Sequence, residues 1–297
     1  LTLSKRTKAL HNIYYLCVDH GESLDHSLAD LKARSRNLLA SLENRDVTLP
    51  DSIPLKSNLA TINGQRLRFF AIQDAELDQL NDIDDERLQW FDIQTSNTTT
   101  NTVDLTTQAG LKLELNQAGS RGALADLIAQ EQHNAPLLDF RSFTAEQSIN
   151  ATMQLAREAR YKSTISFYKV LDIDGSVLDP ITKNILKPSD TGYADAAQHQ
   201  DNIYSPLSGL RIANKRSSAQ EVNISIDSLL APLAVVDNRK GQTETYFAFE
   251  EANSDGIAHF KSMGSNCIGL EDLRGGGDSD FDDMILSFKN FEVISFT

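Results

Sequence analysis

The stretch from Glu271 to Phe288, EDLRGGGDSDFDDMILSF, constrains the fold more than any other part of this sequence. Within residues 271–283, six carboxylates accompany a single base, Arg274, and three consecutive glycines interrupt the charges. Glycine tolerates the left-handed backbone that a tight turn requires, so this segment is expected to fold back on itself and bring oxygen atoms together. Crowded carboxylates repel one another unless a cation or separate solvation compensates them. Ca²⁺ takes roughly six to eight oxygen ligands, and flexible acidic turns supply them.

The residues that follow the acidic turn predict a buried strand. Met284, Leu286 and Phe288 alternate with their neighbours in the way of a strand that enters a core. A solvated acidic hairpin loop without a cation is the alternative, but the three glycines and the attached strand favour a cation site. We therefore predict Ca²⁺ as the bound ion, with ligands at Glu271, Asp272, Asp278, Asp280 and Asp283.

A second segment is predicted to contribute to the same site. The run ANSDG, residues 252–256, lies between two predicted strands. Asn253 and Asp255 are two residues apart, which places both side-chain oxygens on one side of a turn, and Gly256 allows tight closure. Asn253 and Asp255 are therefore added to the predicted metal ligands. A hairpin closed by an Asx turn, without any metal, is the alternative for this segment.

The acidic turn also carries a family resemblance. The run Glu271-Asp272-Leu273, Gly276-Gly277-Asp278, Asp280-Phe281 and Asp283 resembles the signature of the bacterial family called domain of unknown function 4114. Upstream segments extend the resemblance over about residues 137–297. The resemblance implies a calcium-binding β-domain and an extracellular or cell-surface location, because members often end large secreted or surface proteins. Asp282 departs from the usual Asn of the family, which adds charge and removes no ligand.

Charge and hydropathy exclude several classes of protein. A formal net charge of −14 argues against nucleic acid as a partner and fits divalent cations or a salty exterior. No apolar run approaches the ~20 residues of a membrane-spanning helix. The first residues lack an apolar signal core, so a signal was removed, the chain is a segment of a longer protein, or export uses a C-terminal route. Cys17 and Cys267 are more simply two thiols than a pair, although pairing is left open.

Strand patterns predict a mainly β fold in three parts. Residues 1–45 are expected to hold an N-terminal strand and an amphipathic helix, and residues 46–136 a small β-rich domain with a linker helix. Residues 137–297 are expected to form a calcium-binding antiparallel β-sandwich. The predicted strands are 66–72, 88–93, 111–115, 149–161, 164–170, 221–226, 233–236, 245–249, 257–260 and a C-terminal strand from 284.

One amphipathic helix is predicted, over residues 24–42. Ser23 is its expected N-cap, and the leucines on its stripe are Leu24, Leu28, Leu31, Leu38 and Leu42. The helix is expected to pack on a β-domain or on a neighbouring subunit. An exposed stripe of this size is a liability on a monomer, so self-association into a homo-oligomer or polymer is expected.

The sequence predicts a protein that is not an enzyme. It contains no nucleophile elbow, phosphate loop, dinucleotide fingerprint or zinc-protease motif. The predicted function is a non-enzymatic, extracellular, calcium-binding structural or adhesive protein of a bacterial surface, matrix or filament. The alternative is a calcium-dependent carbohydrate-binding module that binds surface glycans through Trp90 and three tyrosines expected to be exposed, Tyr161, Tyr193 and Tyr204. A glycoside hydrolase with a hidden carboxylate pair among the 42 acidic residues is the third possibility.

Overall fold

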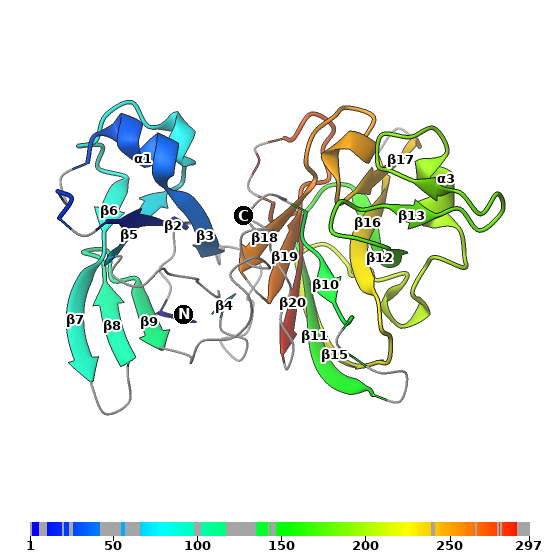
Figure 1. Cartoon of the computed structure of the whole chain (residues 1–297), viewed down its shortest axis with the longest axis horizontal. Helices are drawn as coiled ribbons and strands as arrows, with labels where there is room; N and C mark the ends of the chain where they lie inside the picture. The colour runs from blue at the N-terminus through cyan, green and yellow to red at the C-terminus, as the bar shows by residue number, and fades with distance from the viewer. Residues whose placement is uncertain are drawn as a thin grey trace.

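The computed structural model shows a mainly β protein with few helices, as the sequence predicts (Figure 1). No helix in the described part of the chain is long and apolar enough to span a membrane. The structure describes residues 2–5, 11–19, 21–23, 26–41, 55–56, 66–97, 102–116, 135–141, 143, 147–238, 241–264, 266–277, 279 and 281–289.

Two antiparallel sheets form the N-terminal part. One has the strand order β4-β1-β9-β8-β7 and the other β3-β2-β5-β6. Strands from residues 1–45 and from residues 46–116 therefore hydrogen-bond within the same sheets, while the predicted division at residue 45 stays a prediction. The bounds are β1 (Thr2–Lys5), β2 (His11–Val18), β3 (Arg36–Ser41), β4 (Leu55–Lys56), β5 (Arg66–Gln73), β6 (Leu88–Trp90), β7 (Asp92–Asn97), β8 (Thr102–Thr106) and β9 (Lys112–Asn116).

Two of the predicted N-terminal strands are confirmed, and the third is divided. Segments 66–72 and 111–115 correspond to β5 and β9. The predicted strand 88–93 is interrupted at the buried Phe91, where the chain leaves β6 in one sheet and enters β7 in the other. A pattern of apolar residues does not reveal such a change of sheet, because both halves are extended.

The prediction of a helix through residue 42 is wrong. The helix α1 spans Leu28–Arg34, and its N-cap is Ser27, which forms a capping box with Asp30. Ser35 is extended, and residues 36–41 form β3, which pairs with β2. A seven-residue helix has little stability of its own, so pairing with β2 and burial of Leu38 and Leu39 determine the structure here.

The described leucines of the predicted stripe are covered by the chain itself. Leu31 packs in a cluster with Tyr14, Leu16 and Phe70, whereas Leu38 packs in a different cluster with Ile13 and other residues. Leu24 and Leu42 lie outside the described residues. The stripe therefore gives no reason to expect self-association.

Two further antiparallel sheets form the C-terminal part and contribute to one hydrophobic core. One has the order β15-β11-β20-β19-β18, and the other has the order β10-β16-β12 with β17 also paired to β16. Met153 of β11, Phe167 of β12 and Val236 of β16 meet in this core. The bounds are β10 (Leu138–Asp139), β11 (Ile149–Arg157), β12 (Lys162–Val170), β15 (Arg216–Ile224), β16 (Leu229–Asp237), β17 (Thr243–Phe247), β18 (Phe260–Gly264), β19 (Cys267–Leu270) and β20 (Met284–Lys289).

Short elements complete this part of the chain. A small hairpin is separate from both sheets, and one short helix covers residues 193–198. These elements are β13 (Val177–Leu178), β14 (Ile185–Leu186), α3 (Tyr193–Gln198) and the 3-10 helices η1 (Leu77–Gln79), η2 (Ser205–Leu207) and η3 (Glu250–Ala252). The predicted linker helix at 123–130 lies outside the described residues.

The strand β20 is buried on both faces of its sheet. Met284, Leu286 and Phe288 point into the C-terminal core, as predicted from their alternation. Ile285 points to the opposite face, where it shares a second core with Ile13 and other N-terminal residues. Figure 1 shows β18, β19 and β20 between the N-terminal sheets and the strands β12 and β16. The acidic turn is thus attached to two buried strands, β19 and β20.

Candidate metal centre

The acidic turn connects two paired strands. Gly269 of β19 lies opposite Ile285 of β20, and a parallel bridge joins Leu270 to Asp282. The chain leaves β19 at Leu270 and enters β20 at Met284. Because the strands fix both ends of the turn, carboxylates from its two ends are brought together.

The three glycines have the left-handed backbone that the sequence predicts. Their φ angles are +83° at Gly275, +81° at Gly276 and +48° at Gly277. A Cβ atom at Gly277 would lie 2.4 Å from Oε1 of Glu271. Gly277 therefore provides both the backbone conformation and the space that this carboxylate occupies.

Glu271 has no exposed surface and is held by the turn itself. The backbone N–H of Leu273 donates to its Oε1 (3.1 Å), and the backbone N–H of Ser279 donates to its Oε2 (3.2 Å). An ionised carboxylate has about four acceptor positions. These bonds orient the Glu271 carboxylate within the turn.

Asp272, which is buried, and Asp283, which is half-buried, form an acidic pair at the base of the turn. The backbone N–H of Asp272 donates to Oδ2 of Asp283 (2.8 Å), and the hydroxyl of Ser163 donates to Oδ2 of Asp272 (2.7 Å). Burial raises the pKa of Asp272. Burial, together with repulsion from Asp272 and Glu271, raises the pKa of Asp283 to about 9. Negative charge at this pair is therefore poorly compensated within the protein.

Arg157 is a basic side chain beside this acidic pair, and it offsets the negative charge of the pair only in part. Its guanidinium is attracted to Asp272 and Asp283, but burial lowers its pKa below the ordinary value. Its Nε atom is buried and has no hydrogen-bond partner among the described residues. The cation beside the acidic pair is therefore itself buried, at a cost that burial imposes on its charged form.

The structure uses the predicted ligand Asn253 to close its own loop. Its Oδ1 accepts the backbone N–H of Phe247 (2.7 Å), and its Nδ2 donates to the carbonyl oxygens of Phe247 (3.1 Å) and Ile257 (2.8 Å). Only 6% of its surface is exposed. These are the contacts that the alternative interpretation predicts for Asn253, in which an Asx turn closes the hairpin without any metal.

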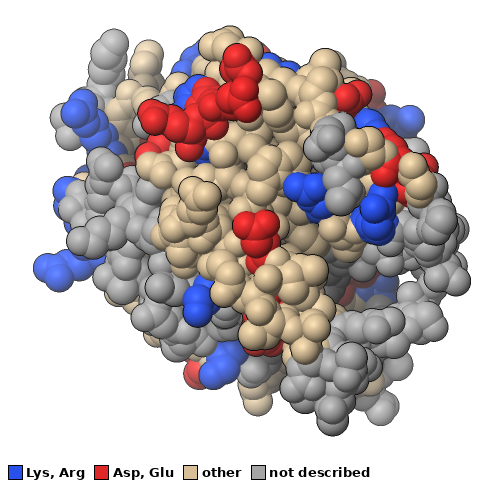
Figure 2. Space-filling view, turned by 90° about the vertical axis from the view of Figure 1, so that its left-hand side faces the viewer, with Lys and Arg blue, Asp and Glu red and all other residues tan. Residues whose placement is uncertain are grey.

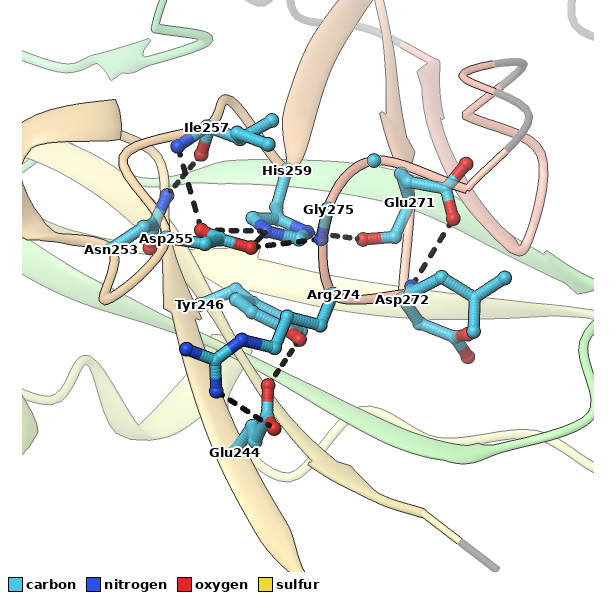
Figure 3. A network of polar contacts seen from close by, with 12 residues as sticks. Glu244, Tyr246, Asn253, Asp255, Ile257, His259, Glu271, Asp272, Arg274 and Gly275 are labelled. Atoms are coloured by element: carbon cyan, nitrogen blue, oxygen red, sulfur yellow. Dashed lines mark hydrogen bonds and ion pairs between the residues drawn. The ribbon is translucent and has the colours of Figure 1, made fainter.

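Asp255 points toward the glycine turn (Figure 3). Its Oδ2 accepts the backbone N–H of Gly275 (3.0 Å) and lies 3.1 Å from Nε2 of His259. Burial raises the pKa of Asp255, but the contacts with Gly275, His259 and Ile257 together outweigh it and lower the pKa. The structure therefore joins the 252–256 loop to the acidic turn, as the sequence suggests, through a carboxylate that is well compensated.

Oxygen donors dominate this region, which is the chemistry that a hard cation such as Ca²⁺ requires. Glu271, Asp272 and Asp283 fit that requirement by type, and burial raises the pKa of Asp272 and of Asp283. Among the residues that the structure describes, however, no three His, Cys, Asp or Glu side chains form a group that could hold a metal ion. Asp278 and Asp280, two of the predicted ligands, lie outside those residues.

A second acidic run in the N-terminal part has the contacts of a solvated loop. Both carboxylate oxygens of Asp85 accept hydrogen bonds from Arg87, and Asp82 accepts the backbone N–H of Asp84. Asp82, Asp84 and Glu86 are exposed. Figure 2 shows acidic side chains gathered near the top of the face formed by this end of the molecule. Nothing in this run points to a ligand.

The expectation of exposed tyrosines is wrong for two of the three. Tyr193 is 1% exposed, and its hydroxyl contacts Tyr168 and the carbonyl of Gly175. Tyr204 is 8% exposed and packs in the C-terminal core. Trp90 and Tyr161 are half-buried, and the described large apolar side chains that are exposed are all aliphatic.

His259, Ser163 and Arg157 belong to the site but were not predicted. A single histidine, serine or arginine on a strand or loop has no spacing signal, because its partners come from distant parts of the chain. Ser163 is 109 residues from the Asp272 that it contacts. Only the pairing of strands places these residues beside the turn.

A family comparison supports the resemblance carried by the acidic turn. Residues 212–290 match the family described as domain of unknown function (DUF4114). The DUF4114 match contains β15 to β20, both loops of the candidate centre and every predicted ligand. It confirms the resemblance over its C-terminal part, which was predicted to begin at about residue 137. No curated protein and no solved structure matches the chain.

Proposed function

We propose that this protein is a non-enzymatic, extracellular structural or adhesive module of a bacterial surface, matrix or filament, stabilised by Ca²⁺. The observation that supports the proposal is the position of three carboxylates at the two ends of a glycine turn: the buried Glu271 and Asp272, and the half-buried Asp283. The proposed ligands are the carboxylates of the turn, Asp278 and Asp280 included. A bound Ca²⁺ favours the ionised forms of Asp272 and Asp283, whose pKa values burial raises.

The proposed ion stabilises the turn and the strands attached to it. A ligand present at 100 times its Kd adds about 2.7 kcal/mol to the stability of the state that binds it. The turn continues directly into β20, which contributes to both hydrophobic cores. A calcium ion at this point therefore stabilises the packing of the sheet rather than a peripheral loop, which suits a module that bears load or contacts neighbours.

Calorimetry with Ca²⁺ tests the proposal. The intact chain is expected to give a saturable binding heat that Asp283→Asn removes or strongly weakens. Asp84→Asn, in the exposed acidic loop of the N-terminal part, is the matched control and is expected to leave binding unchanged. The proposal is overturned if saturating Ca²⁺ gives no heat, or if both variants bind as the wild type does.

Self-association belongs to the proposed structural role. Sedimentation of the intact chain with Ca²⁺ and with chelator measures it directly. A concentration-dependent increase in mass that requires Ca²⁺ is expected for a module that assembles. A monomer at high concentration under both conditions would restrict the proposal to contact with other molecules.

A further inference from the structure

Asp255 and His259 form a buried link between the 252–256 loop and the acidic turn. Asp255 accepts the backbone N–H of Gly275 at 3.0 Å, in the middle of the turn. Nδ1 of His259 lies 2.8 Å from the carbonyl oxygen of Glu271, where the turn begins. Nε2 of His259 lies 3.1 Å from Oδ2 of Asp255, so the two side chains also contact each other. Two points of the turn are thereby tied to one loop.

The ring of His259 is fixed in place. It has no exposed surface, and it stacks on Tyr246 with ring centroids 3.5 Å apart and an interplanar angle of 12°. A carbonyl oxygen only accepts, so Nδ1 donates to Glu271 and the ring has one orientation. The backbone N–H of Glu271 also donates to the carbonyl of His259 (2.9 Å). His259 and Glu271 are therefore held together through both backbone and side chain.

A third contact holds the same turn from β17. Arg274 lies 3.6 Å from Glu244, and the hydroxyl of Tyr246 donates to the other oxygen of Glu244 (2.5 Å). Figure 3 shows these groups on one side of the turn, with Tyr246 beneath His259. The beginning, the middle and the only base of the turn are all restrained from this side.

We infer that Asp255 and His259 are positioning residues of the calcium site, which hold the glycine turn so that its carboxylates converge, and that Asp255 does not bind the ion. The inference rests on the proposed function. Oδ2 of Asp255 already accepts the backbone N–H of Gly275, Oδ1 accepts that of Ile257 (3.4 Å), and both oxygens contact Nε2 of His259. Residues that orient ligands from behind typically change metal affinity by ~10–100-fold when they are replaced.

Terbium luminescence separates a positioning role from a ligand role. Decay rates of bound Tb³⁺ in H₂O and D₂O give the number of water molecules on the ion. Asp255→Ala is expected to weaken binding at least ~10-fold and to leave this number unchanged. Asp283→Ala, the ligand control, is expected to add about one water in place of the lost oxygen. Asp255→Asn keeps an acceptor for the Gly275 amide and is expected to recover part of the affinity.

His259→Gln provides a second variant in case Asp255→Ala does not fold. It is expected to weaken Tb³⁺ binding without changing the water count. A cooperative unfolding transition in chelator confirms that the variant is folded. The inference is overturned if Asp255→Ala adds a water as the ligand control does, or if neither position affects affinity. If the wild-type chain binds neither Tb³⁺ nor Ca²⁺, the proposed function is overturned, and the positioning role is overturned with it.

Discussion

Gly277 and Gly275 share a left-handed backbone but differ in their surroundings, which separates two effects of a side chain in the turn. A residue other than glycine in this conformation costs roughly 1–2 kcal/mol at either position. At Gly275 a Cβ atom would meet nothing within 4 Å, whereas at Gly277 it would overlap the carboxylate of Glu271. Gly277→Ala is therefore expected to lower both the free energy of unfolding and calcium affinity by more than Gly275→Ala. Urea unfolding and calorimetry measure the two, and equal losses would contradict the contact with Glu271.

Asp283 is expected to make stability depend on pH. Its pKa of about 9 in the folded chain exceeds the ~3.9 of an unfolded aspartate. Between these values the folded chain keeps a proton that the unfolded chain releases, so the free energy of unfolding should fall as pH rises from about 4 to about 9. Urea unfolding in chelator at several pH values measures the slope. Asp283→Asn, which does not titrate, should flatten it, and an unchanged slope would show that other groups are responsible.

At the level of elements, the turn and β19 are in close contact. A Cβ atom at Gly269 would lie 2.3 Å from the carbonyl oxygen of Phe281. Gly269→Ala must therefore displace either β19 or the end of the turn, and overpacking of this kind costs roughly 1–3 kcal/mol. Urea unfolding is expected to show this loss in chelator as well as in Ca²⁺. A stability equal to that of the wild type would mean that the turn accommodates the methyl group.

The sequence predicts an element correctly where residues that are neighbours in the chain determine its structure. The glycine turn, the strand that begins at Met284 and the alternation of its side chains follow from residues that are neighbours in sequence. The helix predicted to reach residue 42 fails because Leu38 fits a helical stripe and a buried strand equally well. Only β2, more than twenty residues earlier along the chain, decides between them. In the same way, Asp255 has the sequence context of a ligand, and its contact with His259 appears only in the folded chain.

At the level of the whole molecule, the two halves share a core. The second core contains Leu39 and Phe69 from the N-terminal sheets together with Met263 and Cys267 from the C-terminal sheet. Lys261 adds a polar contact, because its ammonium lies 2.7 Å from Glu76 and 5.3 Å from the ring of Phe281 in the acidic turn. The turn is therefore connected to the N-terminal sheets by both apolar and charged contacts.

These contacts predict that calcium stabilises both halves together. Trp90, the single tryptophan of the chain, lies on β6 in the N-terminal part, so its fluorescence reports unfolding far from the turn. We expect its thermal midpoint to rise with Ca²⁺ and to coincide with the midpoint from circular dichroism. Lys261→Met should reduce the calcium-induced shift at Trp90 while costing less than ~1 kcal/mol of stability, because the ion pair is partly exposed. If Trp90 unfolds separately, at a temperature that Ca²⁺ does not change, the two halves are independent and the shared core does not couple them.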